Sequence, residues 1–434
     1  MKRFHTYYET FGCQMNVFDI EFIESLMLDS GFVSVASPDR ADVIVVNTCS
    51  VREHAERRAI GRLADLSRHD AVLVVCGCMA QRLGERLFEL APGVDIIAGT
   101  DSYVHLPAVA RGILESGGRA VLLEVDRAIN YPLGTYTGSG STSRYLAITR
   151  GCESYCTYCI VPYLRGAVRS RDSSMIIKEI QSLSQADCRE VTLIGQNVMA
   201  FRDGECDFTG LLEQIVEKTA IARIRFLTTH PRDVTGRLFD LMAAEPRICP
   251  HIHLPLQSGS DRILELMNRG YRCDHYRGII REGRRIVHGL AVSTDIIVGF
   301  PGETDEDFQR TLDAVDEVRF DTAFTFKYSP REGTPAAALS DDVPGDVKRE
   351  RLRVLNEKIA RIRREILATH LGSAVEILLD GTVQKGEYQL WKGRTPRFRN
   401  VLVHGDHLKE GDFIEVELKE LRNYTYIGVP MRRR

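Results

Sequence analysis

The sequence contains the stretch Cys152-Glu-Ser-Tyr-Cys156-Thr-Tyr-Cys159, which places three thiols within eight residues. The stretch directly follows a strand pattern at 144–149, so the thiols are expected at the carboxyl end of that strand. Closely spaced thiolates are soft ligands that suit an iron-sulfur cluster or zinc. A [4Fe-4S] cluster on three cysteines keeps one iron open to a small molecule, whereas structural zinc requires a fourth ligand. The spacing favours an iron-sulfur cluster, with zinc or inert thiols as the alternatives.

The composition is that of an ordinary globular protein. The 434 residues include 57 Lys and Arg against 60 Asp and Glu, a net charge of −3, which excludes a protein that is basic over its whole surface. Eleven cysteines are too few, and odd in number, for a disulfide scaffold. There is no run of 18 apolar residues and no apolar signal segment at the start. We therefore expect a cytoplasmic protein without membrane contact, whose clustered cysteines are metal ligands or redox groups.

The hydrophobic pattern divides the chain into three parts and predicts an α/β protein. Residues 1–128 alternate apolar strands with helices, as in a parallel α/β sheet, and residues 129–143 are a Gly/Ser/Thr-rich linker. Residues 371–434 have the short alternating runs of a small β-barrel. Residues 144–370 predict a partial (β/α)6 barrel, because helical patterns separate six candidate strands, at 144–149, 190–194, 223–227, 251–255, 291–298 and 322–328.

A second set of cysteines is spread over the first part of the chain. Cys13, Cys49 and Cys78 each come just after a predicted strand. Because the carboxyl ends of parallel strands meet at one edge of a sheet, we expect these three thiols to converge there. Cys76 falls inside its strand, so Cys78 is the better ligand candidate. Buried cysteines packed as small hydrophobic residues are the alternative for each one taken alone.

These motifs together resemble the radical S-adenosylmethionine (SAM) methylthiotransferase family over nearly the whole chain. The stretch 152–159 is similar to the radical SAM signature, and the surroundings of Cys13, Cys49 and Cys78 are similar to the family's first domain. The resemblance implies SAM and two [4Fe-4S] clusters as cofactors. One cluster would lie on the stretch 152–159, where Tyr158 would pack near the SAM adenine, and an auxiliary cluster would lie on the first-domain cysteines.

Shorter motifs indicate a branch of the family. The stretches 160–166, 195–198, 253–260 and 299–304 look most like the branch that acts on N6-isopentenyladenosine in tRNA. The resemblance implies insertion of a methylthio group at C2 of this nucleoside, on the 3′ side of the anticodon, with SAM as methyl donor and radical source. The alternatives are a methylthiotransferase for N6-threonylcarbamoyladenosine or a ribosomal protein, and a non-catalytic RNA-binding protein with zinc.

Four further residues at strand ends are candidate contacts for SAM or the base: Gln196, Asn197, Gln257 and Ser258. Side chains at the carboxyl ends of barrel strands line the active sites of such folds. Ordinary capping of a strand end explains Gln196 and Asn197 equally well.

Basic and aromatic residues of the C-terminal part are candidate RNA contacts, because phosphates attract Lys and Arg and unpaired bases stack on rings. The candidates are Trp391, Lys392, Arg394, Arg397 and Arg399, with a solvated loop as the alternative. The resemblance implies that this part is a TRAM-like barrel. An Arg-rich helix expected at 348–364 is either a second basic surface or an ordinary charged helix face. The implied partners are the tRNA anticodon stem-loop and a low-potential electron donor such as flavodoxin or ferredoxin, and we expect a monomer.

Overall fold

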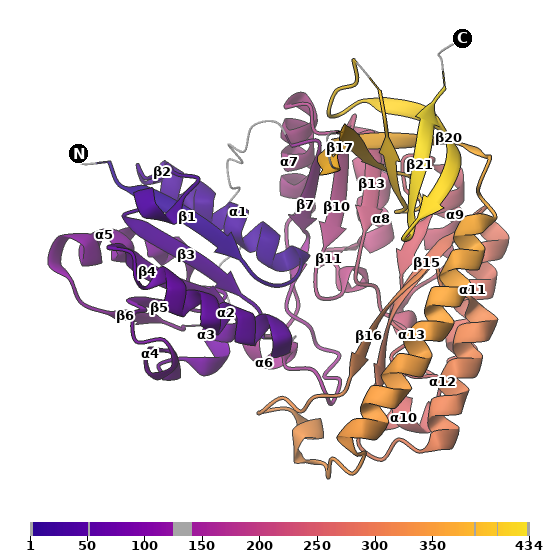
Figure 1. Ribbon diagram of the computed structural model, residues 1–434, viewed down its shortest axis with the longest axis horizontal. Coiled ribbons are helices and arrows are strands. Elements are labelled where there is room, and N and C mark those ends of the chain that lie inside the picture. The colour runs from indigo at the N-terminus through magenta and orange to yellow at the C-terminus, as the bar shows by residue number, and fades with distance from the viewer. Residues whose placement is uncertain (1–2, 51–52, 125–140, 386–387, 406, 432–434) are drawn as a thin grey trace.

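The computed structural model describes residues 3–50, 53–124, 141–385, 388–405 and 407–431. Its larger sheets follow one another along the chain as a parallel sheet, a partial barrel and a closed barrel (Figure 1). The α/β fold class predicted from the sequence is therefore confirmed. The linker expected at 129–143 lies outside the described residues up to 140, and the next strand begins at Ser143.

The first sheet is parallel throughout and has six strands in the order β2-β1-β3-β4-β5-β6. Strands β3 and β4 are buried along their whole length, as expected for strands covered by helices on both faces. Helices α1 and α5 pack on one face, and α2, α3 and α4 pack on the other. The elements are β1 (His5–Thr10), α1 (Gln14–Asp29), β2 (Val33–Ser34), β3 (Val43–Thr48), α2 (Glu53–Leu66), β4 (Val72–Gly77), α3 (Cys78–Leu83), α4 (Arg86–Leu90), β5 (Ile96–Ala98), α5 (Leu106–Ser116) and β6 (Ala120–Leu122).

The second unit contains all six strands expected in the middle of the chain. They form two parallel three-stranded sheets, β7-β10-β13 and β14-β15-β16. Backbone hydrogen bonds from β13 to the segment before β14 connect the two halves, so the strands follow one another in chain order as in a partial barrel. The strands are β7 (Ser143–Ala147), β10 (Glu190–Ile194), β13 (Arg223–Phe226), β14 (His251–His253), β15 (Ala291–Val298) and β16 (Thr322–Lys327).

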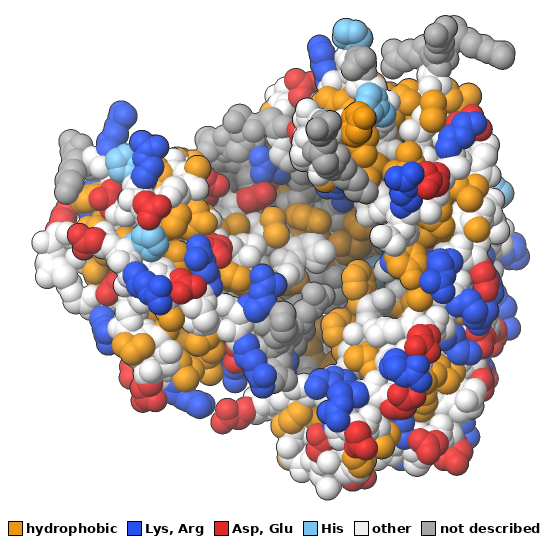
Figure 2. Space-filling model, viewed as in Figure 1, with side chains coloured by type: hydrophobic (Ala, Val, Ile, Leu, Met, Phe, Trp, Pro, Cys, Tyr) orange, Lys and Arg blue, Asp and Glu red, His pale blue; other side chains and the backbone are white. Residues whose placement is uncertain are grey.

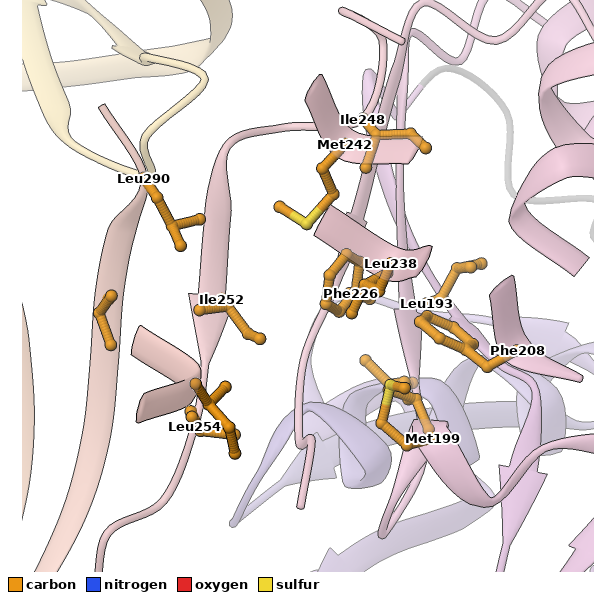
Figure 3. Close-up of a cluster of buried hydrophobic side chains, with 14 of the residues drawn as sticks. Leu193, Met199, Phe208, Phe226, Leu238, Met242, Ile248, Ile252, Leu254 and Leu290 are labelled. Atoms are coloured by element: carbon orange, nitrogen blue, oxygen red, sulfur yellow. The ribbon is translucent and has the colours of Figure 1, made fainter. Parts of the chain in front are cut away.

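Helices cover the outside of this partial barrel and enclose the largest apolar core. Figure 3 shows side chains of the strands, such as Leu193, Phe226 and Ile252, packed with helix residues such as Phe208 and Leu238. The helices are α6 (Val161–Arg165), α7 (Ser173–Gln185), α8 (Phe208–Lys218), α9 (Gly236–Ala244), α10 (Asp261–Leu266), α11 (Cys273–Ile286), α12 (Asp305–Val318) and α13 (Gly345–Ala368). The unit also contains two short antiparallel strand pairs, β8 (Thr149–Arg150) with β9 (Arg169–Ser170), and β11 (Arg202–Asp203) with β12 (Cys206–Asp207).

The C-terminal residues form a closed five-stranded barrel in the order β17-β18-β19-β21-β20. It docks at the amino-terminal ends of the central strands, because Arg223, the first residue of β13, donates to the Arg394 carbonyl at 2.8 Å. Phe398 also stacks on His251, the first residue of β14. The first cysteine loop, at 152–159, follows the carboxyl end of a strand in the central unit. The C-terminal barrel therefore lies at the opposite end of the central strands from this loop (Figure 1). Its strands are β17 (Ala374–Lys385), β18 (Tyr388–Arg394), β19 (Asn400–Val403), β20 (Phe413–Arg422) and β21 (Thr425–Pro430).

Helix α13 has the length to cross a membrane but the composition of a charged surface helix. Its apolar residues Leu355, Ile359 and Ile362 are buried against the partial barrel. Among the described residues, no helix combines the length and the apolarity that membrane crossing needs. Basic and acidic side chains are intermixed on the face of the molecule that carries α12 and α13 (Figure 2).

Candidate functional site

The first candidate site is the loop that carries Cys152, Cys156 and Cys159. The loop starts at Gly151, where the chain has a φ of 83° and a Cβ would lie 2.0 Å from the Ala167 carbonyl oxygen. Only glycine is compatible with that conformation and contact. The sequence therefore fixes the point at which the chain turns from β8 into the cysteine loop.

Hydrogen bonds from two distant segments hold this loop in place. The side chain of Gln196, just after β10, accepts the Gly151 N–H with Oε1 at 2.6 Å. Thr157 donates its N–H to the Met267 carbonyl at 3.1 Å and its hydroxyl to the Leu266 carbonyl at 2.8 Å. Gln196 was predicted as a site residue, and the structure places it against the cysteine loop.

The electrostatics of the loop suit an iron-sulfur cluster bound by three thiolates, whose negative charge a buried cation can balance. Burial, together with the neighbouring Cys156, raises the pKa of the Cys159 thiol to about 12. The buried guanidinium of Arg269 donates from Nη1 to Cys156 Sγ at 3.1 Å. Iron cations would hold the thiols as thiolates and remove the repulsion among them. Three soft donors beside a buried cation therefore fit a [4Fe-4S] cluster.

The second candidate site lies at the carboxyl edge of the first sheet. Cys13 follows β1 and caps α1, Cys49 follows β3, and Cys78 begins α3 directly after β4. Cys49 packs against the residue that precedes Cys13, because a Cβ at Gly12 would come within 2.7 Å of the Cys49 Cβ. The Cys78 thiol is near enough to Cys13 to raise its pKa, in addition to the larger effect of burial.

The structure separates Cys76 from this trio. Cys76 is fully buried inside β4 and packs with Phe22 and Tyr103 on one face of the sheet. Cys78 instead packs with Ile160 and Leu164 of the second unit. The placement agrees with the choice of Cys78 over Cys76, while the ligand role itself stays a prediction.

Neither trio has the geometry of a single-ion site. Within the described parts of the chain, no group of three or more His, Cys, Asp or Glu side chains could hold one metal ion. The cysteines of a [4Fe-4S] cluster bind separate iron atoms and need not converge on one point. The fit to a cluster therefore rests on the donor set and its charge environment.

A buried arginine connects the second trio to the partial barrel. Arg165, at the end of α6, donates from Nε to Cys78 Sγ at 3.3 Å and from Nη2 to Asp19 Oδ2 at 2.9 Å. The other Asp19 oxygen accepts from Arg150 at 3.0 Å, and Tyr103 donates its hydroxyl to Asp19 at 3.3 Å. Asp19 belongs to the first unit and both arginines to the second, so the network fixes the two units against each other.

The packing brings the two cysteine trios into one region. Ile160 follows Cys159 directly and lies in the same buried cluster as Cys78. Figure 2 shows the surface hollowed between the first sheet and the rest of the chain. Each trio also has one buried arginine that donates to one of its sulfurs, Arg269 at Cys156 and Arg165 at Cys78.

Sequence reasoning missed three of the residues that organise this region. Asp19, Arg150 and Arg269 belong to no motif that we singled out, and their partners are far away in the sequence. Arg165 stands in the stretch 160–166, which we quoted only for its resemblance. A polar residue on a helix face otherwise rich in apolar residues, as Asp19 is in α1, is the one signal that could have drawn attention to it.

The side chains of Asn197 and Ser258 form hydrogen bonds within the protein, and the backbone of Gln257 does so too. Asn197 donates to Asp233 at 2.7 Å and accepts the Met199 N–H at 3.1 Å, so its side chain caps the short 3-10 helix Val198–Ala200. The Ser258 hydroxyl is fully buried and accepts the Ser260 N–H at 3.2 Å. Buried Gln257 has a φ of 68° and donates its N–H to the Asp295 carbonyl at 2.8 Å.

Tyr158 is enclosed by apolar side chains. It packs against the cluster formed by Ile263, Met267, Phe300, Tyr328 and Ala336. Burial raises the pKa of its hydroxyl well above the ordinary value. Phe300 belongs to the Gly-Phe-Pro-Gly stretch at 299–302, so the structure brings these two motifs together. The contact of Tyr158 with adenine stays a prediction.

The predicted RNA-binding arginines make ion pairs within the chain. Arg394 pairs with Asp380 at 2.7 Å, and Arg399 pairs with Asp321 at 2.6 Å. Their side chains are 19% and 11% exposed. Arg225 donates to the carbonyls of Thr395 and Pro396, so this loop attaches the barrel to the central strands. An RNA contact through Arg394 or Arg399 would have to compete with these pairs.

The other predicted RNA contacts are less enclosed. Lys392 lies 3.5 Å from Asp380 and is 47% exposed, and Trp391 packs against the barrel core. Arg397 borders a cavity of about 540 Å³ between the barrel and the partial barrel. On α13, most basic side chains pair with acids, for example Arg351 with Glu303 and Lys358 with Asp316. The charge pattern of α13 is therefore largely balanced within the protein.

Comparison with known proteins places the chain in a family. Residues 5–99 match the model of Uncharacterized protein family UPF0004, and residues 146–315 match the Radical SAM superfamily. The chain is 40% identical over 434 residues to the tRNA-2-methylthio-N(6)-dimethylallyladenosine synthase of Moorella thermoacetica, with 96% of each chain covered. It is 40% identical to the synthase of that name from Geobacter sulfurreducens, with 98% of this chain and 97% of the relative covered.

A solved structure shares the fold at low sequence identity. The radical S-adenosylmethionine methyltransferase TsrM from Kitasatospora setae, solved with cobalamin and a [4Fe-4S] cluster, matches with a TM-score of 0.57. The two chains are 14% identical, and the match covers 77% of this chain and 74% of TsrM. The near-complete match to the synthases decides the identity: this chain belongs to the family of tRNA-2-methylthio-N(6)-dimethylallyladenosine synthases, within the radical SAM superfamily.

Proposed function

We propose that this protein is a tRNA-modifying transferase that inserts a methylthio group at C2 of N6-isopentenyladenosine, on the 3′ side of the anticodon. The observation that carries the proposal is 40% identity to synthases of this name over nearly the full length of both chains. Substrates carrying threonylcarbamoyl groups and ribosomal proteins are not favoured, because the similar chains bear the dimethylallyladenosine name. Two cysteine trios in one region support the same function.

The residues have separate roles in this proposal. Cys152, Cys156 and Cys159 would hold the cluster that binds SAM, and the trio Cys13, Cys49 and Cys78 would hold the auxiliary cluster. When bound, the clusters and SAM supply the one-electron and sulfur chemistry that an inert aromatic C–H requires. The chain positions these groups: Gln196 fixes the first cysteine loop, and Arg165 and Asp19 fix the second trio against it.

Further parts of the proposal concern organisation and partners. We divide the chain into an N-terminal domain (1–128), a linker (129–143), a radical SAM core (144–370) and a TRAM-like barrel (371–434). The candidate SAM contacts are Tyr158, which lies within the first cysteine loop, and Gln196, Asn197, Gln257 and Ser258, which follow strands of the central unit in the sequence. A low-potential donor such as flavodoxin or ferredoxin would supply electrons, and a monomer in the cytoplasm is the expected state.

Substrate selectivity tests the function directly. Anaerobically reconstituted protein should methylthiolate an anticodon stem-loop carrying isopentenyladenosine at least about 100-fold faster than the same RNA with unmodified adenosine. The reason is that the prenyl group provides five carbons of apolar surface, each CH₂ contributing about 0.8 kcal/mol when buried. Mass spectrometry of the digested nucleosides measures the product. Equal rates on the two RNAs would exclude the proposed substrate.

Metal content tests the cofactors. Reconstituted protein should carry about eight iron atoms per chain, corresponding to two [4Fe-4S] clusters. Anaerobic iron and sulfide quantification measures this, and zinc is determined in the same samples. Substantial zinc without iron would favour the non-catalytic RNA-binding alternative instead.

A further inference from the structure

Two large aromatic side chains stand exposed beside the candidate site. Tyr155 and Tyr163 are each 49% exposed, although most large apolar side chains of the described residues are buried. Their rings contact each other edge to face, with centroids 6.3 Å apart and planes at 76°. Exposed aromatic residues in contact with each other offer a ready-made surface for another flat ring.

The pair is located where the two cysteine trios approach each other. Tyr155 immediately precedes Cys156 in the first cysteine loop. Tyr163 lies on α6, the helix whose neighbouring residues Leu164 and Arg165 pack against Cys78. One ring therefore belongs to the first trio's loop and the other to the helix that contacts the second trio. A substrate that reaches both trios must come close to this surface.

The backbone holds both rings in this exposed position. Tyr155 has a φ of 42°, in the left-handed region that non-glycine residues rarely adopt. Its carbonyl oxygen accepts a hydrogen bond from Asn268 Nδ2 at 3.0 Å, which keeps the loop in that conformation. On α6, Leu164 and Arg165 are buried, so Tyr163 is directed away from the core. Strain of this kind often occurs at functional sites.

We propose that Tyr155 and Tyr163 form a stacking platform for an unpaired base of the tRNA anticodon loop, next to the adenosine that is modified. This inference rests on the proposed function, because it takes RNA as the substrate. An adenosine that enters a buried site leaves the stack of its loop, and its neighbours lose a stacking partner. An aromatic ring beside the entrance replaces that partner at any base, since every base has a π face.

Charge and size favour an RNA base over other occupants. Two rings are too small for a stable protein–protein interface, which buries at least about 1,000 Å² in total. They match one or two bases in area. Arg394 and Arg399, the basic residues of the barrel loop, already pair with acidic residues of the chain. Stacking of a base near the trios would therefore give the RNA a contact that those arginines do not provide. The platform would hold the loop without reading its sequence.

Ring-removing and ring-conserving variants of the holoenzyme test the platform. Tyr155→Leu and Tyr163→Leu should each weaken binding of an isopentenyl-modified anticodon stem-loop about 10-fold, because stacking on one ring is lost. Tyr155→Phe and Tyr163→Phe should bind as the wild type does. Leu90→Ala, at a residue with a similar exposed fraction of 47% on α4, is the matched control and should also bind as the wild type does. Fluorescence anisotropy measures the dissociation constant.

A second readout reports stacking itself. A 2-aminopurine base beside the target adenosine should lose fluorescence on binding to the wild type and to the Phe variants, and should keep it with the Leu variants. Iron content and SAM cleavage without RNA should be the same in all variants. The platform would be overturned if the Leu variants bound the RNA and quenched the 2-aminopurine fluorescence as the wild type does. It would also be overturned if the Phe and Leu variants lost affinity equally. The proposed function would fail separately, if the wild type itself does not methylthiolate the modified RNA.

Discussion

Replacing Cys13, Cys49 or Cys78 with alanine is expected to abolish methylthiolation while SAM cleavage stays measurable. The three residues form a trio apart from the cysteine loop at 152–159, so the cluster that binds SAM keeps its ligands. Loss of a residue that only supports a metal ligand costs about 10- to 100-fold, and loss of a ligand itself should exceed that. Product formation and 5′-deoxyadenosine release are measured on the same samples, with iron falling from about eight to about four per chain.

Cys76 provides a matched control within the same stretch of chain. It is fully buried in the core of the first sheet, two residues from Cys78, and its side chain packs away from the trio. Cys76→Ala should lower stability modestly and leave iron content and methylthiolation in place. Loss of the auxiliary cluster in Cys76→Ala, or retention of it in Cys78→Ala, would show that the ligands were assigned incorrectly.

Asp19→Asn is expected to destabilise the protein by about 3–5 kcal/mol. Asp19 is fully buried and accepts hydrogen bonds from two arginines of the neighbouring unit, Arg150 and Arg165. Removing the charge of one partner leaves the other charges buried without full compensation, which costs far more than losing an exposed pair. Urea unfolding measures the loss, and limited proteolysis should show that the first sheet becomes separable from the partial barrel.

An exposed ion pair is the control for Asp19. Glu213 pairs with Arg237 at 2.6 Å, and the two side chains are 45% and 52% exposed. Glu213→Gln should unfold together with the wild type, because solvent screens exposed pairs. If Asp19→Asn is as stable as the wild type, the buried network does not hold the two units together.

The first cysteine trio and the fold could be predicted because their signals are local. The spacing of three cysteines within eight residues can be read directly from the sequence. Runs of apolar residues predicted the strands, and the structure places these strands within a few positions of the predicted ranges. The convergence of Cys13, Cys49 and Cys78 was predictable by one more step, because the carboxyl ends of parallel strands share an edge. Each of these inferences needs only sequence spacing and a general rule of sheet geometry.

The RNA-binding residues show where such reasoning stops. Arg394 and Arg399 are basic residues beside aromatic ones, and the pattern alone cannot show that Asp380 and Asp321 pair with them. Arg399 and Asp321 are 78 positions apart in the sequence. A basic motif shows where positive charge lies along the chain, whereas its availability to a partner depends on the acids that folding brings beside it.

The sequence by itself determined where most strands lie along the chain, the cysteine spacing and the family, and hence the proposed reaction. Only the tertiary structure decided which charged groups contact the cysteines. Arg165 donates to Cys78, which is 87 positions away in the sequence, and Arg269 donates to Cys156, which is 113 positions away. The physical reason is the separation in sequence between the residues that interact. Strand and cysteine patterns arise from neighbouring residues, whereas a buried ion pair depends on the packing of whole units and leaves no periodic trace in the sequence.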